Sequence, residues 1–178
     1  MKSLHIRIED EPLSEVRRHC VFSVRSYFGV GRIVYTEEAL TIGEEIREHF
    51  TIKDPWDITS LRGRVTLSDW IRCWVLSRNP GEYVYCDTDV EVVYPVIPVL
   101  PSITKPALLW RKDIGGSDYA VMFCQNEAAS RWLLDILQQY CATPDILAML
   151  MARKDCPPIH GFTHHCFPTN NEQRWWRT

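Results

Sequence analysis

The sequence predicts an α/β protein with a mostly parallel central sheet flanked by helices. Short β-type runs alternate with helical patterns along the chain, which is the order that builds a parallel sheet with covering helices. The length of 178 residues corresponds to one domain, and a hydrophobic content of 46% is enough for a real core. No repeat, heptad run or low-complexity linker divides the chain. We therefore expect residues 1–178 to form a single compact domain.

The first half of the chain contains three predicted strands and three predicted helices. We expect strands at 4–8, 32–35 and 83–86, the last of them central, and helices at 13–27, 40–50 and 66–78. Gly43 predicts a break in the second helix, because glycine weakens a helix interior. Thr66 or Ser68 can cap the start of the third helix.

The second half begins with a connection at 95–106, where four prolines exclude regular structure. Beyond it we expect strands at 107–110 and 119–124, a helix at 126–140 and a short helix at 144–152.

The most informative motif follows the predicted central strand. Side chains of an extended chain alternate between faces, so Asp87, Asp89 and Glu91 are expected to point the same way. Three anions on one face repel one another, and a divalent cation relieves that repulsion; carboxylate oxygens suit Mg²⁺ or Mn²⁺. The sequence therefore predicts a metal site, with the alternative that these carboxylates only end a strand and face solvent.

The helix before this strand adds a second polar group. Asp69 and Arg72 are three residues apart, which places them on one face of the helix. They can pair with each other or reach a ligand together.

These linked residues resemble a known family, the glycosyltransferases whose sugar-binding region carries a D-x-D motif, including the bacterial capsule and yeast mannosyl-chain type enzymes. The family pattern is a helix reading Ser-Asp-x-x-Arg, a turn, a strand with an aromatic residue, and Asp-x-Asp followed by Val. The matching residues are Ser68, Asp69, Arg72, Tyr85, Asp87, Thr88, Asp89 and Val90. The resemblance covers residues 66–93 and is weaker at 3–10 and 31–36. The family's Gly-Gly pair before the strand is missing, since 79–83 reads Asn-Pro-Gly-Glu-Tyr.

The resemblance implies a nucleotide-sugar-binding fold of the GT-A type and transfer of a sugar from a UDP- or GDP-sugar, with retained anomeric configuration. It implies that Asp87 and Asp89 act in catalysis through Mn²⁺ or Mg²⁺, and that a late histidine, His164 or His165, completes the metal shell. The donor would be held by Asp69, Arg72 and Ser68, with Tyr35 as a flat stacking surface. The acceptor stays open between a glycan, a protein, a lipid-linked sugar and a modified nucleic-acid base.

Composition limits the other classes of function. The net charge of −3 provides no broad basic field for gripping nucleic acid. Seven cysteines without a C-x-x-C pair do not form a disulfide framework or zinc ribbon, which favours a reducing cytoplasm. There is no run of 18 apolar residues, so we expect a soluble protein without a transmembrane segment. Because the chain is short for such a transferase, a homo-oligomer would be one way to complete an acceptor site.

Two alternatives belong to other classes. One is a non-catalytic nucleotide-sugar-binding or interaction protein of the same fold. The other is a D-x-D phosphatase with Asp87 as nucleophile, although that class has Gly-Thr where this chain has Val90-Glu91. The Trp175-Trp176 pair is considered as a lid over the donor or as a contact to a partner.

Overall fold

The structure is a computed structural model that describes residues 1–96, 103–145 and 156–165. Most of the predicted helix at 144–152, part of the proline-rich connection and the tryptophan pair at 175–176 lie outside the described residues. Within them, no helix is both long enough and apolar enough to cross a membrane.

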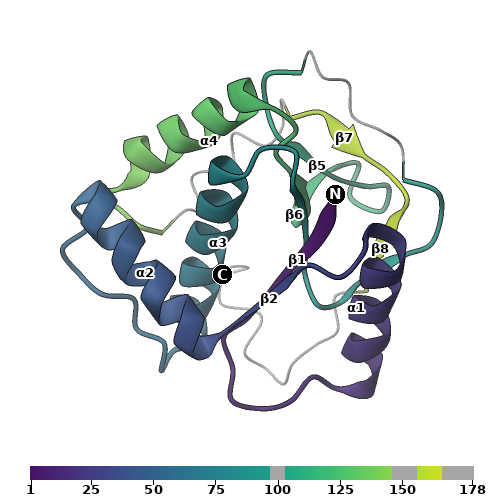
Figure 1. Cartoon of the computed structure of the whole chain (residues 1–178), viewed down its shortest axis with the longest axis horizontal. Helices are drawn as coiled ribbons and strands as arrows, with labels where there is room; N and C mark the ends of the chain where they lie inside the picture. Colours follow the sequence, from purple (N-terminus) through teal and green to yellow (C-terminus); the bar gives the residue numbers. More distant parts are fainter. Residues whose placement is uncertain (97–102, 146–155, 166–178) are drawn as a thin grey trace.

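The described residues build one large sheet, one small sheet and four helices (Figure 1). The large sheet contains β1 (Lys2–Arg7), β2 (Arg32–Tyr35), β3 (Tyr83–Cys86), β5 (Ala107–Arg111), β6 (Gly116–Phe123) and β7 (Pro158–Ile159), in the order β2-β1-β3-β6-β5-β7. The small sheet pairs β4 (Val90–Val92) with β8 (Phe162–His164). The helices are α1 (Glu15–Phe28), α2 (Thr36–Phe50), α3 (Leu61–Arg78) and α4 (Glu127–Tyr140).

The α/β class is confirmed, and the large sheet is mixed, because β6 runs opposite to the other five strands. Strand β1 runs parallel to both β2 and β3, and β5 runs parallel to β7. Strand β6 is antiparallel to β3 and to β5. The reason is local: β5 and β6 are joined by only the four residues 112–115, and a connection this short permits a hairpin but no crossover.

Three layers result from the alternation of side chains along the strands. Helices α2, α3 and α4 cover one face of the large sheet, and α1 with the small sheet covers the other (Figure 1). Strand β1 sends Leu4 and Ile6 into the larger core beneath α2 to α4, whereas β3 sends Val84 and Cys86 into the smaller core that contains Val24 of α1. The sheet is thus buried on both faces.

Helix α3 begins earlier than the sequence predicts. Its cap is Ser60, whose Oγ accepts a hydrogen bond from the N–H of Gly63 at 3.0 Å, so neither Thr66 nor Ser68 caps it. Gly63 permits this start, since a Cβ atom there would lie 1.7 Å from the carbonyl oxygen of Asp57.

Gly43 does not break α2, which is continuous over Thr36–Phe50. A Cβ atom at this position would lie 3.1 Å from Cδ1 of Leu67 on α3. The glycine therefore serves the close approach of two helices, and packing outweighs its weak helix propensity.

Candidate metal centre

The acidic motif lies at the point where the helical connections of two neighbouring strands lead to opposite faces of the sheet. The crossover from β1 to β2 passes through α1 on one face, and the crossover from β2 to β3 passes through α2 and α3 on the other. Such a reversal leaves a crevice at the carboxyl ends of the two adjacent strands, here β1 and β3, and ligands of open α/β sheets bind in this crevice. Asp87 directly follows β3 and lies at that edge.

Asp87 and Asp89 converge because the chain turns between them. Strand β3 ends at Cys86, the N–H of Val90 donates to the carbonyl oxygen of Asp87 at 3.2 Å, and β4 starts at Val90. The prediction that a single extended run would place Asp87, Asp89 and Glu91 on one face is therefore wrong in its geometry. Glu91 lies apart from the two aspartates and bonds to two histidines, as described below.

Strand pairing brings His164 to the turn. Val90 of β4 is in register with His164 of β8, and the N–H of His165 donates to the carbonyl oxygen of Asp89 at 3.0 Å. One ligand-bearing atom each of Asp87, Asp89 and His164 lies within 4.8 Å of the other two. Nε2 of His164 is 3.1 Å from Asp89 and 3.9 Å from Asp87.

The other ring nitrogen of His164 has a carboxylate partner of its own. Its Nδ1 lies 3.2 Å from Oδ2 of Asp118 on β6. Asp118 is held in turn by Arg111 at 2.8 Å and by the N–H of Ala120, also at 2.8 Å. A carboxylate that binds one imidazole nitrogen fixes the ring and directs the second nitrogen, which is the usual arrangement behind a metal-binding histidine.

Asp87 is held from the opposite side by a buried arginine. Nη2 of Arg72 lies 3.3 Å from Asp87, 3.2 Å from Asp69 and 3.0 Å from the hydroxyl of Tyr85. That hydroxyl donates to Asp87 at 2.5 Å, and Nη1 of Arg72 donates to the carbonyl oxygen of Tyr119 at 2.7 Å. Arg72 is only 5% exposed, so its contacts are with the protein and it fixes the position of the motif's first carboxylate.

The charges of the cluster are strongly coupled. Burial lowers the pKa of His164, but hydrogen bonds to Asp118 and Asp89 outweigh it and raise that pKa to about 11. Burial opposes ionisation of Asp89, yet the hydrogen bond and charge of His164 hold its pKa below the ordinary range. Burial raises the pKa of Asp87, which Arg72 offsets only in part, and burial likewise raises the pKa of Asp69 to about 7.

This donor set fits a divalent cation. Two carboxylate oxygens and one imidazole nitrogen lie within 4.8 Å of one another, close to the separation of about 4 Å between two ligands bound to one ion at bond lengths of about 2.0 to 2.2 Å. Oxygen donors suit Mg²⁺ and Mn²⁺ alike, and the imidazole favours the transition metal. Asp87, Asp89 and His164 would hold the ion, with Asp118 orienting the histidine.

The remaining predicted site residues are placed differently. His165 faces away from the cluster, because successive side chains alternate at the end of β8, and its Nε2 lies 2.8 Å from Glu91, which also contacts His19 at 3.1 Å. Ser68 is half-buried on α3, one residue before Asp69. Tyr35 ends the edge strand β2 and is two strands away from Asp87.

Two contacts had no signal in the sequence. Arg17 of α1 donates to Oγ1 of Thr88 at 2.7 Å and so supports the turn between the two aspartates. Asp118 lies 46 residues before His164, and the bond between them depends on how distant strands pair. Spacing along the chain reveals neither.

Compared with known protein families and with curated proteins, the chain matches none of them. The assignment of the site therefore depends on its geometry and chemistry.

Proposed function

We propose that this protein is a metal-dependent glycosyltransferase that binds a UDP- or GDP-sugar at Asp87, Asp89 and His164. The observation that carries the proposal is the convergence of these three side chains at the carboxyl end of β3. At this point the helical connections of β1 and β3 lie on opposite faces of the sheet. Carboxylates at such a crevice are suited to a metal-bound diphosphate.

The resemblance of residues 66–93 to the D-x-D glycosyltransferases supports the same reading. Its matching residues include the Arg72 and Tyr85 that hold Asp87 in place. A diphosphate gains negative charge as the bond to the sugar breaks, and a bound divalent cation would supply the positive charge that stabilises it.

The residues of the chain then have separate roles. Asp87, Asp89 and His164 would hold the ion, and Asp118 keeps the imidazole oriented. Arg72 positions Asp87 from inside the protein. Asp69 lies 3.2 Å from the same guanidinium, and burial raises its pKa to about 7, so this carboxyl group is suited to exchange a proton or to accept a hydrogen bond from a sugar hydroxyl.

The test is calorimetric binding of a panel of UDP- and GDP-sugars, with and without Mn²⁺, to the wild type and to Asp89→Asn. Asparagine preserves the size of the side chain and removes the charge that binds the metal. The matched control is Asp135→Asn, which removes an exposed carboxylate from α4, remote from the cluster.

We expect binding by the wild type and by Asp135→Asn only when Mn²⁺ is present, and no metal-dependent binding by Asp89→Asn. Hydrolysis or transfer of the bound sugar then distinguishes the enzyme from a binding protein of the same fold. Absence of donor binding to the folded, Mn²⁺-loaded wild type would overturn the proposal, and trapping of a phosphoryl group on Asp87 would favour the phosphatase.

A further inference from the structure

Helix α1 directs Arg17 toward the sheet and not toward solvent. Arg17 lies three residues before Cys20 and seven before Val24, so the three side chains share one face of the helix. Cys20 and Val24 are buried on that face. Arg17 is half-buried, whereas the next residue, Arg18, is exposed. A charged side chain thus occupies a position on the otherwise apolar inner face of α1.

Arg17 contacts the turn between the two aspartates of the metal centre. Its Nη1 donates to Oγ1 of Thr88 at 2.7 Å, and Thr88 is only 6% exposed. Burial opposes ionisation of Asp89, but the hydrogen bond and charge of His164, followed by the charge of Arg17, hold the pKa of Asp89 below its ordinary range. The guanidinium is therefore close enough to the cluster for its charge to act there.

Arg17 has no carboxylate partner of its own. Within residues 1–96, 103–145 and 156–165 it makes no ion pair, and its bond to Thr88 uses only one of the several N–H donors of the guanidinium. Arg72, on the other side of Asp87, is by contrast bound to two carboxylates. Arg17 therefore keeps donors for a further ligand.

A cation at this position opposes the binding of a metal ion alone. The positive charges of Arg17 and of an ion held by the cluster would repel each other, and charges in a partly buried site are only weakly screened. An anion that contacts both of them removes the repulsion and gains from each. The placement of Arg17 is therefore favourable when the ion carries an anion, and unfavourable when it does not.

We propose that Arg17 is a ligand-binding residue of the metal centre and donates hydrogen bonds to an oxygen of the diphosphate that the ion carries. This inference rests on the proposed function, from which it takes both the ion and the diphosphate. Guanidinium groups form charge-assisted hydrogen bonds with phosphate oxygens. Thr88 keeps the guanidinium in place. Arg17 lies outside residues 66–93, so the resemblance does not assign it.

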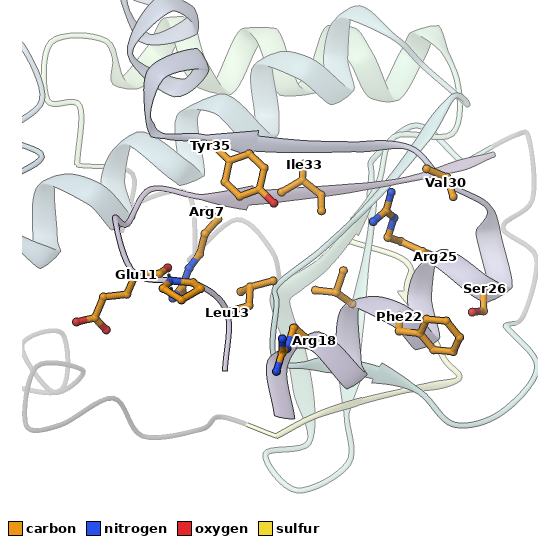
Figure 2. A pocket seen from close by; sticks show the side chains of 12 residues that line it. Arg7, Glu11, Leu13, Arg18, Phe22, Arg25, Ser26, Val30, Ile33 and Tyr35 are labelled. Atoms are coloured by element: carbon orange, nitrogen blue, oxygen red, sulfur yellow. Dashed lines mark hydrogen bonds between the residues drawn. The ribbon is translucent and has the colours of Figure 1, made fainter. Parts of the chain in front are cut away.

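The experiment uses pyrophosphate, which presents the diphosphate without a nucleotide or a sugar. One calorimetric titration adds Mn²⁺ to the metal-free full chain, and a second adds pyrophosphate to the chain in excess Mg²⁺. The variants are Arg17→Gln, which removes the charge, and Arg17→Lys, which keeps the charge without the planar fork. The matched control is Arg18→Gln, because Arg18 points from another side of α1 into a groove that borders the outer strands of the sheet (Figure 2).

We expect the wild type and Arg18→Gln to bind pyrophosphate equally. Arg17→Gln should weaken this binding by roughly 10-fold or more, since a charge-assisted hydrogen bond is lost, and Arg17→Lys should have an intermediate affinity. The affinity of Arg17→Gln for Mn²⁺ should stay the same or rise, because a repelling charge is removed. A residue that only supported the turn would instead weaken the binding of Mn²⁺ as well.

Three results would overturn the proposal. They are absence of pyrophosphate binding by the wild type, wild-type affinity in folded Arg17→Gln and Arg17→Lys, and a weakening that is equally large for Mn²⁺ or in Arg18→Gln. Circular dichroism verifies that each variant is folded. The proposed function is tested separately: binding of pyrophosphate that depends on Arg17, without binding of any sugar donor, would remove the transferase and leave this inference intact.

Discussion

The role of Asp118 behind His164 leads to a quantitative prediction for Asp118→Asn. Asparagine keeps the size of the side chain, but the carboxylate that lies 3.2 Å from Nδ1 of His164 becomes neutral. The imidazole then loses its orienting anion and part of its basicity. Removal of such an outer partner costs roughly 10- to 100-fold in metal affinity, or about 1.4 to 2.7 kcal/mol.

The assay is titration of the metal-free protein with Mn²⁺ for the wild type, Asp118→Asn, His164→Ala and the control Asp135→Asn. We expect His164→Ala to lose more affinity than Asp118→Asn, because it removes a ligand itself, and the control to bind as the wild type does. Far-UV circular dichroism verifies that each variant is folded, since Asp118 also contacts Arg111 at 2.8 Å. Wild-type affinity in folded Asp118→Asn would refute the argument.

Three further predictions concern stability. Arg72→Met leaves the carboxylates of Asp69 and Asp87 without their cation, and urea unfolding should show a loss of about 3 to 5 kcal/mol; a loss below about 1 kcal/mol would contradict the buried network. The pKa of His164 rises from 6.5 to about 11 on folding, so its stabilising contribution is complete below the lower value and disappears toward the higher. Thermal melts of the metal-free wild type should therefore lose stability between these two values more steeply than those of His164→Gln, and equal slopes would exclude this linkage. Gly63→Ala should destabilise by about 2 kcal/mol although alanine favours helices, because its Cβ would lie 1.7 Å from a carbonyl oxygen; a stabilised variant in urea would show that the backbone yields.

Much of the local structure could be predicted from neighbouring residues. The start of α4 is an example, since the side chain of Asn126 accepts the N–H of Ala129 at 2.9 Å, as a capping asparagine should. Strand β3 has the predicted bounds because a short β-type run is closed by turn residues before it and by carboxylates after it. The sequence predicts the start of α3 too late, because the polar stretch around Gly63 has no helical periodicity. The helix begins earlier because Ser60 caps it and Gly63 permits the close approach of a backbone carbonyl group.

The candidate site was predictable in its residue types and not in its geometry. The D-x-D motif indicates carboxylates for a cation, but alternation along a strand gave the wrong reason for their convergence, because a turn intervenes. The sequence also could not decide which of the two histidines, His164 or His165, completes the metal shell. The register of β4 with β8 separated them, placing His164 beside Asp89 and His165 beside Glu91.

The sequence by itself determined the α/β class, most of the helices and strands, and the set of side chains able to bind a metal, since each depends on contacts between residues close along the chain. Tertiary structure alone decided the position of β6 beside β3, the bond from Asp118 to His164 and the different surroundings of His164 and His165. These features bring together residues far apart in sequence, and strand order and register, which fix those distances, depend on how the whole core packs.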